Sequence, residues 1–211
     1  MIGEEKQISR TNARFELLSI CLNHAIWLLG YAEFTITHLD GGSEQEERKR
    51  KLAYDSLLKA AGLLVTLVGE IASANLVSSQ DLSQNFLEAL CQQALAQAQE
   101  ITVSRACWKR NSPSLIASLA HDTAQKYFEA SESLRALETS PSQRVTGFRS
   151  YCAAKHQLYT AIAYYYLSLH QSALHEGGPA VASANAAGAC LLGLHLLSCL
   201  THSKQLNFLP L

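Results

Sequence analysis

The residues able to do chemistry are scattered along this chain. Its eight histidines and six cysteines include no His-x-x-x-His pair near a glutamate and no Cys-x-x-Cys pair. On a helix, the side chains of His170 and His175 would diverge, and those of His121 and Asp122 would point apart. Glu100 lies in an alanine- and glutamine-rich stretch and could be a buried acid, but no partner stands at a catalytic spacing. The pattern disfavours an enzyme and predicts neither a cofactor nor a metal site.

Composition narrows the class of protein. The chain has 211 residues, of which 48% are apolar and 17% are charged, so we expect one folded domain. Alanine and leucine dominate and β-branched runs are scarce, which predicts an all-α fold. A net charge of −1 gives no general attraction for nucleic acid or an anionic membrane. The dispersed cysteines and the polar N-terminus predict a cytoplasmic protein with reduced thiols and no signal peptide.

Helix-start and helix-stop signals divide the chain into six expected helices. Ser43 followed by Glu46 is a capping box, and Ser112 before Pro113 is a second start signal. The glycine pair 177–178 is expected to stop the fifth helix. The short loops predict antiparallel hairpins stacked in a tetratricopeptide-like solenoid, although no strict repeat period is visible. The expected helices cover residues 13–38, 44–72, 86–110, 113–137, 145–175 and 180–200.

Two of these segments are unusually apolar. Residues 13–38 carry too many large apolar side chains for one stripe, so we expect that helix to be buried on two sides. Residues 177–203 contain no Asp, Glu, Lys or Arg, and a stretch of this length could cross a bilayer. Asn185 and His195 interrupt that stretch, so a packing helix is favoured over a membrane span.

A helical protein without catalytic residues usually works through an exposed groove that binds a peptide or helix. Leu115 and Leu119 lie one turn apart on one face of the expected fourth helix, and Thr102 could lie beside them. Glu47 and Lys51 are four residues apart on the second helix and could pair to form a charged rim. From the pattern alone, core packing is the more common role for two such leucines.

The run LAQAQE at 95–100, followed by SLIASL at 114–119, resembles the central signature of the Bro domain family. This module is shared by Alix, Brox, rhophilin and HD-PTP, and residues 100–106 are most similar to the Brox type. The resemblance covers roughly residues 17–187. It implies a boomerang-shaped, tetratricopeptide-like helical fold, of which this chain would be the middle portion.

The resemblance also implies a function. Bro domains of the Alix and Brox type bind the C-terminal amphipathic helix of an ESCRT-III subunit, a charged multivesicular body protein. The chain would then be an adaptor in endosomal sorting or membrane remodelling, recruited to membranes only through its partner. Carried over residue by residue, the family groove implies Leu115 and Leu119 as apolar contacts, Thr102 at a position that is aromatic in Alix, and Glu47 and Lys51 as charged rim. A rhophilin-like scaffold in Rho GTPase signalling is the alternative.

Three departures from the family pattern bear on this expectation. A whole Bro domain is longer, and the 211 residues offer no counterpart of its N-terminal part, which includes a small β-sheet, or of its C-terminal arm. The match fades after Gly178, where residues 181–184 read VASA. The last residues contain no cysteine, so a prenyl anchor is not expected.

Overall fold

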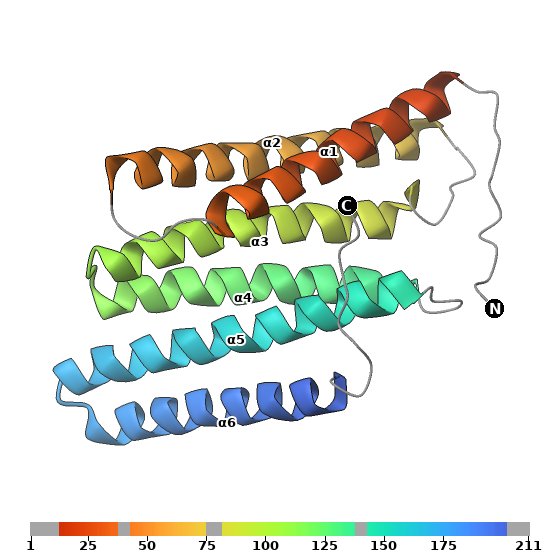
Figure 1. Cartoon of the computed structure of the whole chain (residues 1–211). Helices are drawn as coiled ribbons and strands as arrows, with labels where there is room; N and C mark the ends of the chain where they lie inside the picture. The colour runs from red at the N-terminus through yellow and green to blue at the C-terminus, as the bar shows by residue number, and fades with distance from the viewer. Residues whose placement is uncertain (1–12, 38–42, 75–81, 138–142, 202–211) are drawn as a thin grey trace. The chain divides into compact units, whose positions relative to one another are not determined.

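The computed structural model describes residues 13–37, 43–74, 82–137 and 143–201. Within these ranges every regular element longer than one residue is an α-helix, and no strand occurs (Figure 1). The all-α prediction is therefore confirmed. The expected helix stop at residues 40–42 lies outside the described residues. The helices are α1 Ala13–Thr37, α2 Glu44–Ala74, α3 Gln84–Trp108, α4 Pro113–Arg135, α5 Gln143–Ala173 and α6 Gly177–Thr201.

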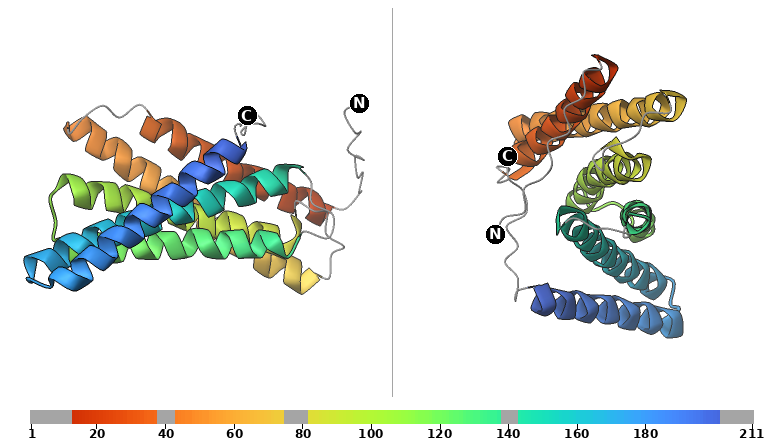
Figure 2. Two further views of the ribbon diagram at one scale, coloured as in Figure 1. Left: turned by 90° about the horizontal axis from the view of Figure 1, so that it is seen from below. Right: turned by 90° about the vertical axis from the view of Figure 1, so that its right-hand side faces the viewer.

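The helices group into two compact units. The first, Met1–Cys91, contains α1, α2 and the start of α3, and the second, Gln92–Leu211, contains the rest of α3 with α4, α5 and α6. In the first unit α1 packs on α2, and in the second α4 packs on α5 and α5 on α6. Figures 1 and 2 show each of these pairs running antiparallel. The antiparallel hairpins expected from the short loops are therefore present inside each unit.

Two predicted helix starts are made by the expected side chains. At the start of α2, the amide of Glu46 donates to Ser43 Oγ at 3.3 Å and the amide of Ser43 donates to Glu46 Oε2 at 3.0 Å. At the start of α4, the amide of Leu115 donates to Ser112 Oγ at 3.4 Å, and Pro113 takes the first helical position. Each cap satisfies backbone donors that have no partner inside the helix.

Helices α3 and α5 end on residues that are not glycine. Arg110 and His175 have positive backbone φ angles of 52° and 60°. After Arg110, the amide of Asn111 donates to the Ala106 carbonyl at 3.0 Å, and α5 closes in the same way at 2.9 Å. This is the Schellman arrangement, which satisfies the last carbonyls of a helix and is most often built on glycine. Here an arginine and a histidine accept the left-handed conformation instead.

The predicted boundary between α5 and α6 is wrong. Gly177 and Gly178 do not stop α5; they form the first turn of α6, which begins three residues before the expected start at Ala180. The amide of Ala180 donates to the Glu176 carbonyl at 3.0 Å. Pro179 fits because the first turn of a helix leaves amide groups unpaired, so a missing N–H there costs little.

Helix α1 is buried on one side rather than on two, which corrects the expectation from its composition. Leu17, Ile20 and Trp27 are exposed, although they are as apolar as the core residues beside them. By length and composition alone, α1 and Glu44–Ser73 of α2 could each cross a membrane, a test that the core helix of a soluble protein also passes. The buried residues of α1 are Leu18, Leu22, Ala25, Leu28 and Ala32.

Helix α6 is a packing helix on α5, as favoured from its sequence. Ser183 is buried and its hydroxyl donates to Gln171 Oε1 of α5 at 2.7 Å, and Ala187 is buried one turn later. The side of α6 that does not face α5 is apolar, because Leu191 and Leu192 are exposed.

Candidate partner-binding surface

The predicted contact residues of α4 lie on a stripe that is partly open to solvent. We call this the α4 stripe: Leu115, Leu119, Asp122 and Lys126, spaced so that all four share one face of the helix. Leu115 is 44% exposed and Leu119 is half-buried. One turn further on, Lys126 Nζ and Asp122 Oδ1 form an ion pair at 2.7 Å. The stripe thus runs from an apolar end to a charged end.

A second stripe of α4 makes the core. Ile116, Ala120, Thr123 and Tyr127 are all buried, and Thr123 satisfies its hydroxyl on the Leu119 carbonyl at 2.8 Å. Because this stripe already fills the packing face, core packing does not explain the exposed Leu115. The alternative role of Leu115 as an ordinary core residue is therefore excluded by its exposure.

Thr102 lies on α3, the helix that precedes the stripe in the chain. It is half-buried, and its hydroxyl donates to the Ala98 carbonyl of its own helix at 3.3 Å. Two residues earlier, Glu100 Oε1 accepts a hydrogen bond from Tyr127 of α4 at 2.7 Å, so this part of α3 runs beside α4. Thr102 is therefore placed on a neighbouring helix, and its role in a groove stays a prediction.

The two predicted rim residues lie in the first unit, on α2. Glu47 is half-buried, and its Oε2 lies 3.8 Å from Nη1 of Arg50. Lys51 is exposed. The five predicted site residues are thus divided between the two units, with Leu115, Leu119 and Thr102 in the second. The charged rim on α2 stays a prediction.

The second unit also contains a half-buried ionic cluster, which we call the Glu100 cluster. Lys155 Nζ of α5 lies 2.9 and 3.1 Å from the two carboxylate oxygens of Glu100. Tyr127 Oη of α4 donates to Glu100 Oε1 at 2.7 Å. The ammonium also lies 5.7 to 6.0 Å from the ring centroids of Tyr127, Tyr151 and Tyr159. Helices α3, α4 and α5 are therefore joined through one carboxylate and one cation.

The electrostatics of the Glu100 cluster favour structure over catalysis. Burial, followed by the negative charge of Glu100, raises the pKa of Tyr127 and that of Tyr159 well above the usual value for a phenol. Burial likewise raises the pKa of Tyr151. These phenols stay protonated at neutral pH, so they are hydrogen-bond donors and not bases. The cation and the carboxylate neutralise each other, which is how buried charges are tolerated.

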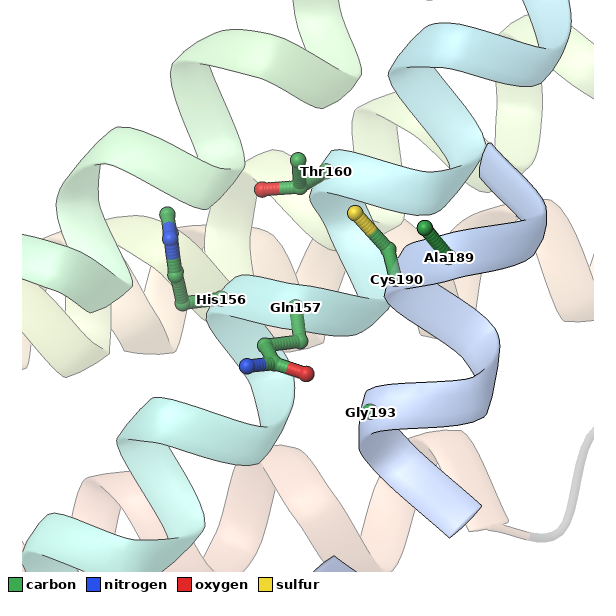
Figure 3. A pocket seen from close by; sticks show the side chains of 6 residues that line it. All are labelled: His156, Gln157, Thr160, Ala189, Cys190 and Gly193. Carbon is green, nitrogen blue, oxygen red and sulfur yellow. The ribbon is translucent and has the colours of Figure 1, made fainter. Parts of the chain in front are cut away.

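A shallow pocket of about 300 Å³ lies between α5 and α6. Figure 3 shows Gln157 turned toward Gly193 of α6, whereas His156 points away from α6 toward α4, where its Nδ1 lies 3.0 Å from the Ala124 carbonyl. The Gln157 Oε1 atom is buried without a hydrogen-bond partner, and a Cβ at Gly193 would come within 2.7 Å of it. Because that atom is at the end of a flexible side chain, a shift of the Gln157 amide would make room for a Cβ there. The pocket is lined by His156, Gln157, Thr160, Ala189, Cys190 and Gly193.

Comparison with known sequences places the chain in a family. The family described as BRO1-like domain matches residues 2–205. The BROX protein of Mus musculus, a BRO1 domain-containing protein, is 34% identical over 178 residues, and that of Homo sapiens is 35% identical over 162 residues. The BROX protein of Danio rerio is 31% identical over 186 residues. The chain belongs to the BRO1-like domain family.

Two solved structures share the fold of this BRO1-like chain. The ALIX BRO1 CHMP4C complex superposes with a TM-score of 0.72 at 22% identity, covering 93% of this chain and 50% of that one. ALIX in complex with the SIVmac239 PYKEVTEDL late domain superposes with a TM-score of 0.64 at 21% identity, covering 83% of this chain and 25% of that one. At these identities the likeness shows the helical fold.

The BRO1-like chain spans about two fifths of the length of its BROX relatives. The matched regions cover 83% of this chain but 42% of mouse BROX, and 75% of this chain but 38% of human BROX. Activities and partners of the whole relatives are therefore not transferred by the match itself.

Sequence reasoning missed two features of the BRO1-like unit. The first is the set of partners of Glu100, which lie 27 and 55 residues further along the chain. The second is the Asp122–Lys126 ion pair at the end of the α4 stripe, which the spacing of opposite charges four residues apart could have indicated. Among the described residues, no group of three or more His, Cys, Asp or Glu side chains is arranged to hold a metal ion.

Proposed function

We propose that this chain is a non-enzymatic adaptor that binds an amphipathic helix along the α4 stripe. The observation that carries the proposal is the exposure of Leu115, 44%, on a stripe separate from the buried core of α4. A helix-binding surface needs exposed apolar side chains at helical spacing with polar groups beside them. Leu115 and Leu119 supply the apolar seat, and the Asp122–Lys126 pair supplies the polar end.

The partner we propose is the C-terminal helix of an ESCRT-III subunit. Support comes from the family resemblance and from the structural similarity to the ALIX BRO1 domain in complex with CHMP4C. Through such a partner, the chain would act in endosomal sorting or membrane remodelling. It would be a cytoplasmic protein that reaches ESCRT-active membranes through this partner.

The proposal is tested by titrating a fluorescein-labelled C-terminal peptide of CHMP4C with the full chain and following fluorescence anisotropy. Leu115→Asp places a carboxylate against the apolar face of the peptide, and loss of a central contact typically costs about 2 kcal/mol, or roughly 30-fold in affinity. Leu119→Asp should weaken binding at least as much. Because Leu119 is half-buried, the thermal unfolding of the Leu119→Asp variant is measured in parallel.

The matched control is Leu169→Asp. Leu169 is 40% exposed, close to the exposure of Leu115, and lies on α5 instead of α4. It should bind the peptide as the wild type does. Equal affinities for the wild type and Leu115→Asp, with both chains folded, would reject the α4 stripe as the seat. A wild-type chain that fails to bind the peptide at all would reject the proposed partner.

A further inference from the structure

The α4 stripe has different charges at its two ends. Residues 101–121, which include the turn from α3 to α4 and the apolar end of the stripe, contain three Lys or Arg residues and no Asp or Glu. The charged end begins at Asp122 and continues to Glu129, three residues beyond Lys126 on the same face of the helix. A partner that lies along the stripe therefore meets a cationic end, an apolar seat and an end with two carboxylates.

Asp122 is the more open member of its ion pair. Lys126 Nζ lies 2.7 Å from Asp122 Oδ1, and the side chains of Lys126 and Asp122 are 24% and 48% exposed. The Oδ2 atom of Asp122 makes no hydrogen bond or ion pair with a described residue, and it is not among the buried polar atoms that lack a partner. One carboxylate oxygen thus remains open to a donor from another molecule.

Glu129 adds a second carboxylate at this end of the stripe. It is exposed, and its Oε1 accepts a hydrogen bond from Gln125 Nε2 at 3.2 Å. No cation among the described residues forms an ion pair with it, because Lys126 is engaged with Asp122. Two carboxylates and one ammonium leave this end with a net charge of −1.

The turn between α3 and α4 supplies the opposite charge. Lys109 and Arg110 are exposed, and neither side chain forms an ion pair or hydrogen bond with a described residue. The backbone of the turn is held on both sides, since the amide of Asn111 closes α3 and Ser112 caps α4. Two unpaired cations therefore precede the first turn of α4, which carries Leu115.

We propose that this order of charges selects an amphipathic helix of bipolar charge, with acidic residues on one side of its apolar segment and basic residues on the other. The inference rests on the proposed function, because it assigns the chemistry of the helix that binds the α4 stripe. The acidic segment lies at the turn with Lys109 and Arg110, and a Lys or Arg of the partner pairs with the open oxygen of Asp122. A helix of about 20 residues is about 30 Å long, which is enough to extend over both ends.

These charges contribute more to selection than to affinity. An exposed ion pair stabilises a complex only slightly, whereas a like charge placed beside an unpaired charge is repelled. A helix with acidic residues on both sides of its apolar segment would bring one set to Asp122 and Glu129. A helix with basic residues on both sides would bring one set to Lys109 and Arg110. Both are disfavoured relative to the bipolar helix.

Three synthetic peptides that share one apolar helical segment test the selection, by fluorescence anisotropy with the full chain. The bipolar peptide has glutamates before the segment and lysines after it. The second peptide has glutamates on both sides, and the third has lysines on both sides. At about 50 mM salt the bipolar peptide should bind about fivefold more tightly than either of the others. The difference should shrink at about 500 mM salt, because salt screens exposed charges.

The carboxylate end is tested with Asp122→Asn. This variant should bind the bipolar and the lysine-flanked peptides about threefold more weakly and the glutamate-flanked peptide more tightly, because Lys126 is left without its carboxylate. Glu132→Gln is the matched control. The Glu132 side chain is 39% exposed and pairs with Arg135 at 2.9 Å, and it lies about 100° around the helix axis from the centre of the stripe. The control should bind all three peptides as the wild type does.

The cationic end is tested with Lys109→Glu. This variant should bind the bipolar and the glutamate-flanked peptides about threefold more weakly, and the lysine-flanked peptide more tightly. A variant that had lost its fold would bind all three peptides more weakly. Changes of opposite sign in the same variant therefore identify an effect of charge.

The failure of this inference differs from the failure of the proposed function. If no peptide binds in a way that Leu115→Asp weakens, the α4 stripe is not a helix-binding surface and both proposals are rejected. If all three peptides bind through Leu115 with equal affinities at low salt, the adaptor function stands and the bipolar selection is rejected. Equal effects of Asp122→Asn and Glu132→Gln would also reject the selection.

Discussion

The Glu100 cluster and the apolar end of the α4 stripe both use helix α4 of the second unit, yet they hold opposite kinds of residue. The cluster contains a carboxylate, an ammonium and phenols, and all of them are engaged with one another. The α4 stripe begins with two leucines that have no chemistry of their own, and one of them is exposed. The charged groups of the cluster thus help to build the scaffold, whereas the leucine end of the stripe is open to solvent.

The difference follows from what burial does to each kind of residue. A buried charge is stable only when it is paired and hydrogen-bonded, so the groups of the Glu100 cluster are committed once the fold forms. An exposed leucine is not committed to a charged partner in this way. The free energy falls when another molecule covers its apolar surface. Perturbing the cluster should therefore change stability, whereas perturbing the stripe should change binding. Three predictions test this separation, beginning with the largest effect.

Alkaline pH should unfold the second unit through its buried acids. The folded chain keeps Cys152, Tyr127 and Tyr159 protonated, because burial raises the pKa of Cys152 from 9.0 to about 12 and raises that of both phenols above 10.0. The unfolded chain loses those protons first. The stability from these groups is thus intact below about pH 9 and is lost as the pH rises toward their folded pKa values. Each group contributes a loss of about 1.4 kcal/mol per pH unit.

Urea unfolding measured from about pH 8 to about pH 11 checks this, with a slope of at least about 4 kcal/mol per pH unit above pH 10 from these three groups, to which Tyr151 adds because burial raises its pKa as well. Tyr127→Phe should lower the slope by about 1.4 kcal/mol per pH unit. The exposed Tyr165 gives the control, Tyr165→Phe, which should keep the full slope. A free energy of unfolding that stays flat up to pH 11 would show that the phenols are not held in their neutral form.

Removing the cation of the Glu100 cluster should be the most destabilising single substitution in this comparison at neutral pH. Lys155→Met removes the cation from the Glu100 carboxylate and leaves phenol donors such as Tyr127 as its partners. Breaking a buried ion pair costs about 3–5 kcal/mol, and we expect the lower end because the two side chains are 20 and 27% exposed. The free energy of unfolding from urea titration measures the loss.

The double variant Glu100→Gln with Lys155→Met is the control, because it removes both charges together. It should lose less than half as much stability as Lys155→Met. Binding of the CHMP4C peptide to the folded variants should stay within about threefold of the wild type, since neither residue lies on the α4 stripe. A large loss of affinity with unchanged stability would assign the cluster to binding and would end the separation drawn here.

Local signals in the sequence predicted most of the fold. The helix starts at Ser43 and Ser112 depend on residues within one turn, so they could be read directly. The stop of α5 could not, because Gly177 and Gly178 are as compatible with a first helical turn as with a stop. The left-handed residue is His175, a residue type that adopts positive φ more often than most but much less often than glycine. The end of the helix is decided by the two closing hydrogen bonds.

The candidate site was less predictable than the fold. The spacing of Leu115 and Leu119 shows that they share a face, but both an exposed and a buried stripe have that spacing on α4. Which stripe faces solvent depends on where α3 and α5 pack. Likewise, the partners of Glu100 lie on two later helices, so only the folded chain reveals them. Tertiary packing decides these points, and periodicity does not record it.

The smallest predicted effect concerns Ser112, the N-cap residue of α4, at the start of the helix that carries the α4 stripe. The Ser112 hydroxyl oxygen accepts a hydrogen bond from the amide of Leu115. This bond fixes the first turn of α4, which carries the proposed contact residue Leu115. Ser112→Ala should lower the free energy of unfolding by about 1 kcal/mol and weaken peptide binding by less than about threefold, because fraying of that turn displaces Leu115 only part of the time. Ser118→Ala, at an exposed mid-helix position, is the control. Alanine has the higher helix propensity, so its stability should be equal to or slightly above that of the wild type. If the two alanine variants unfold alike, the hydroxyl of Ser112 does not hold the turn, and the exposure of Leu115 must depend on packing alone.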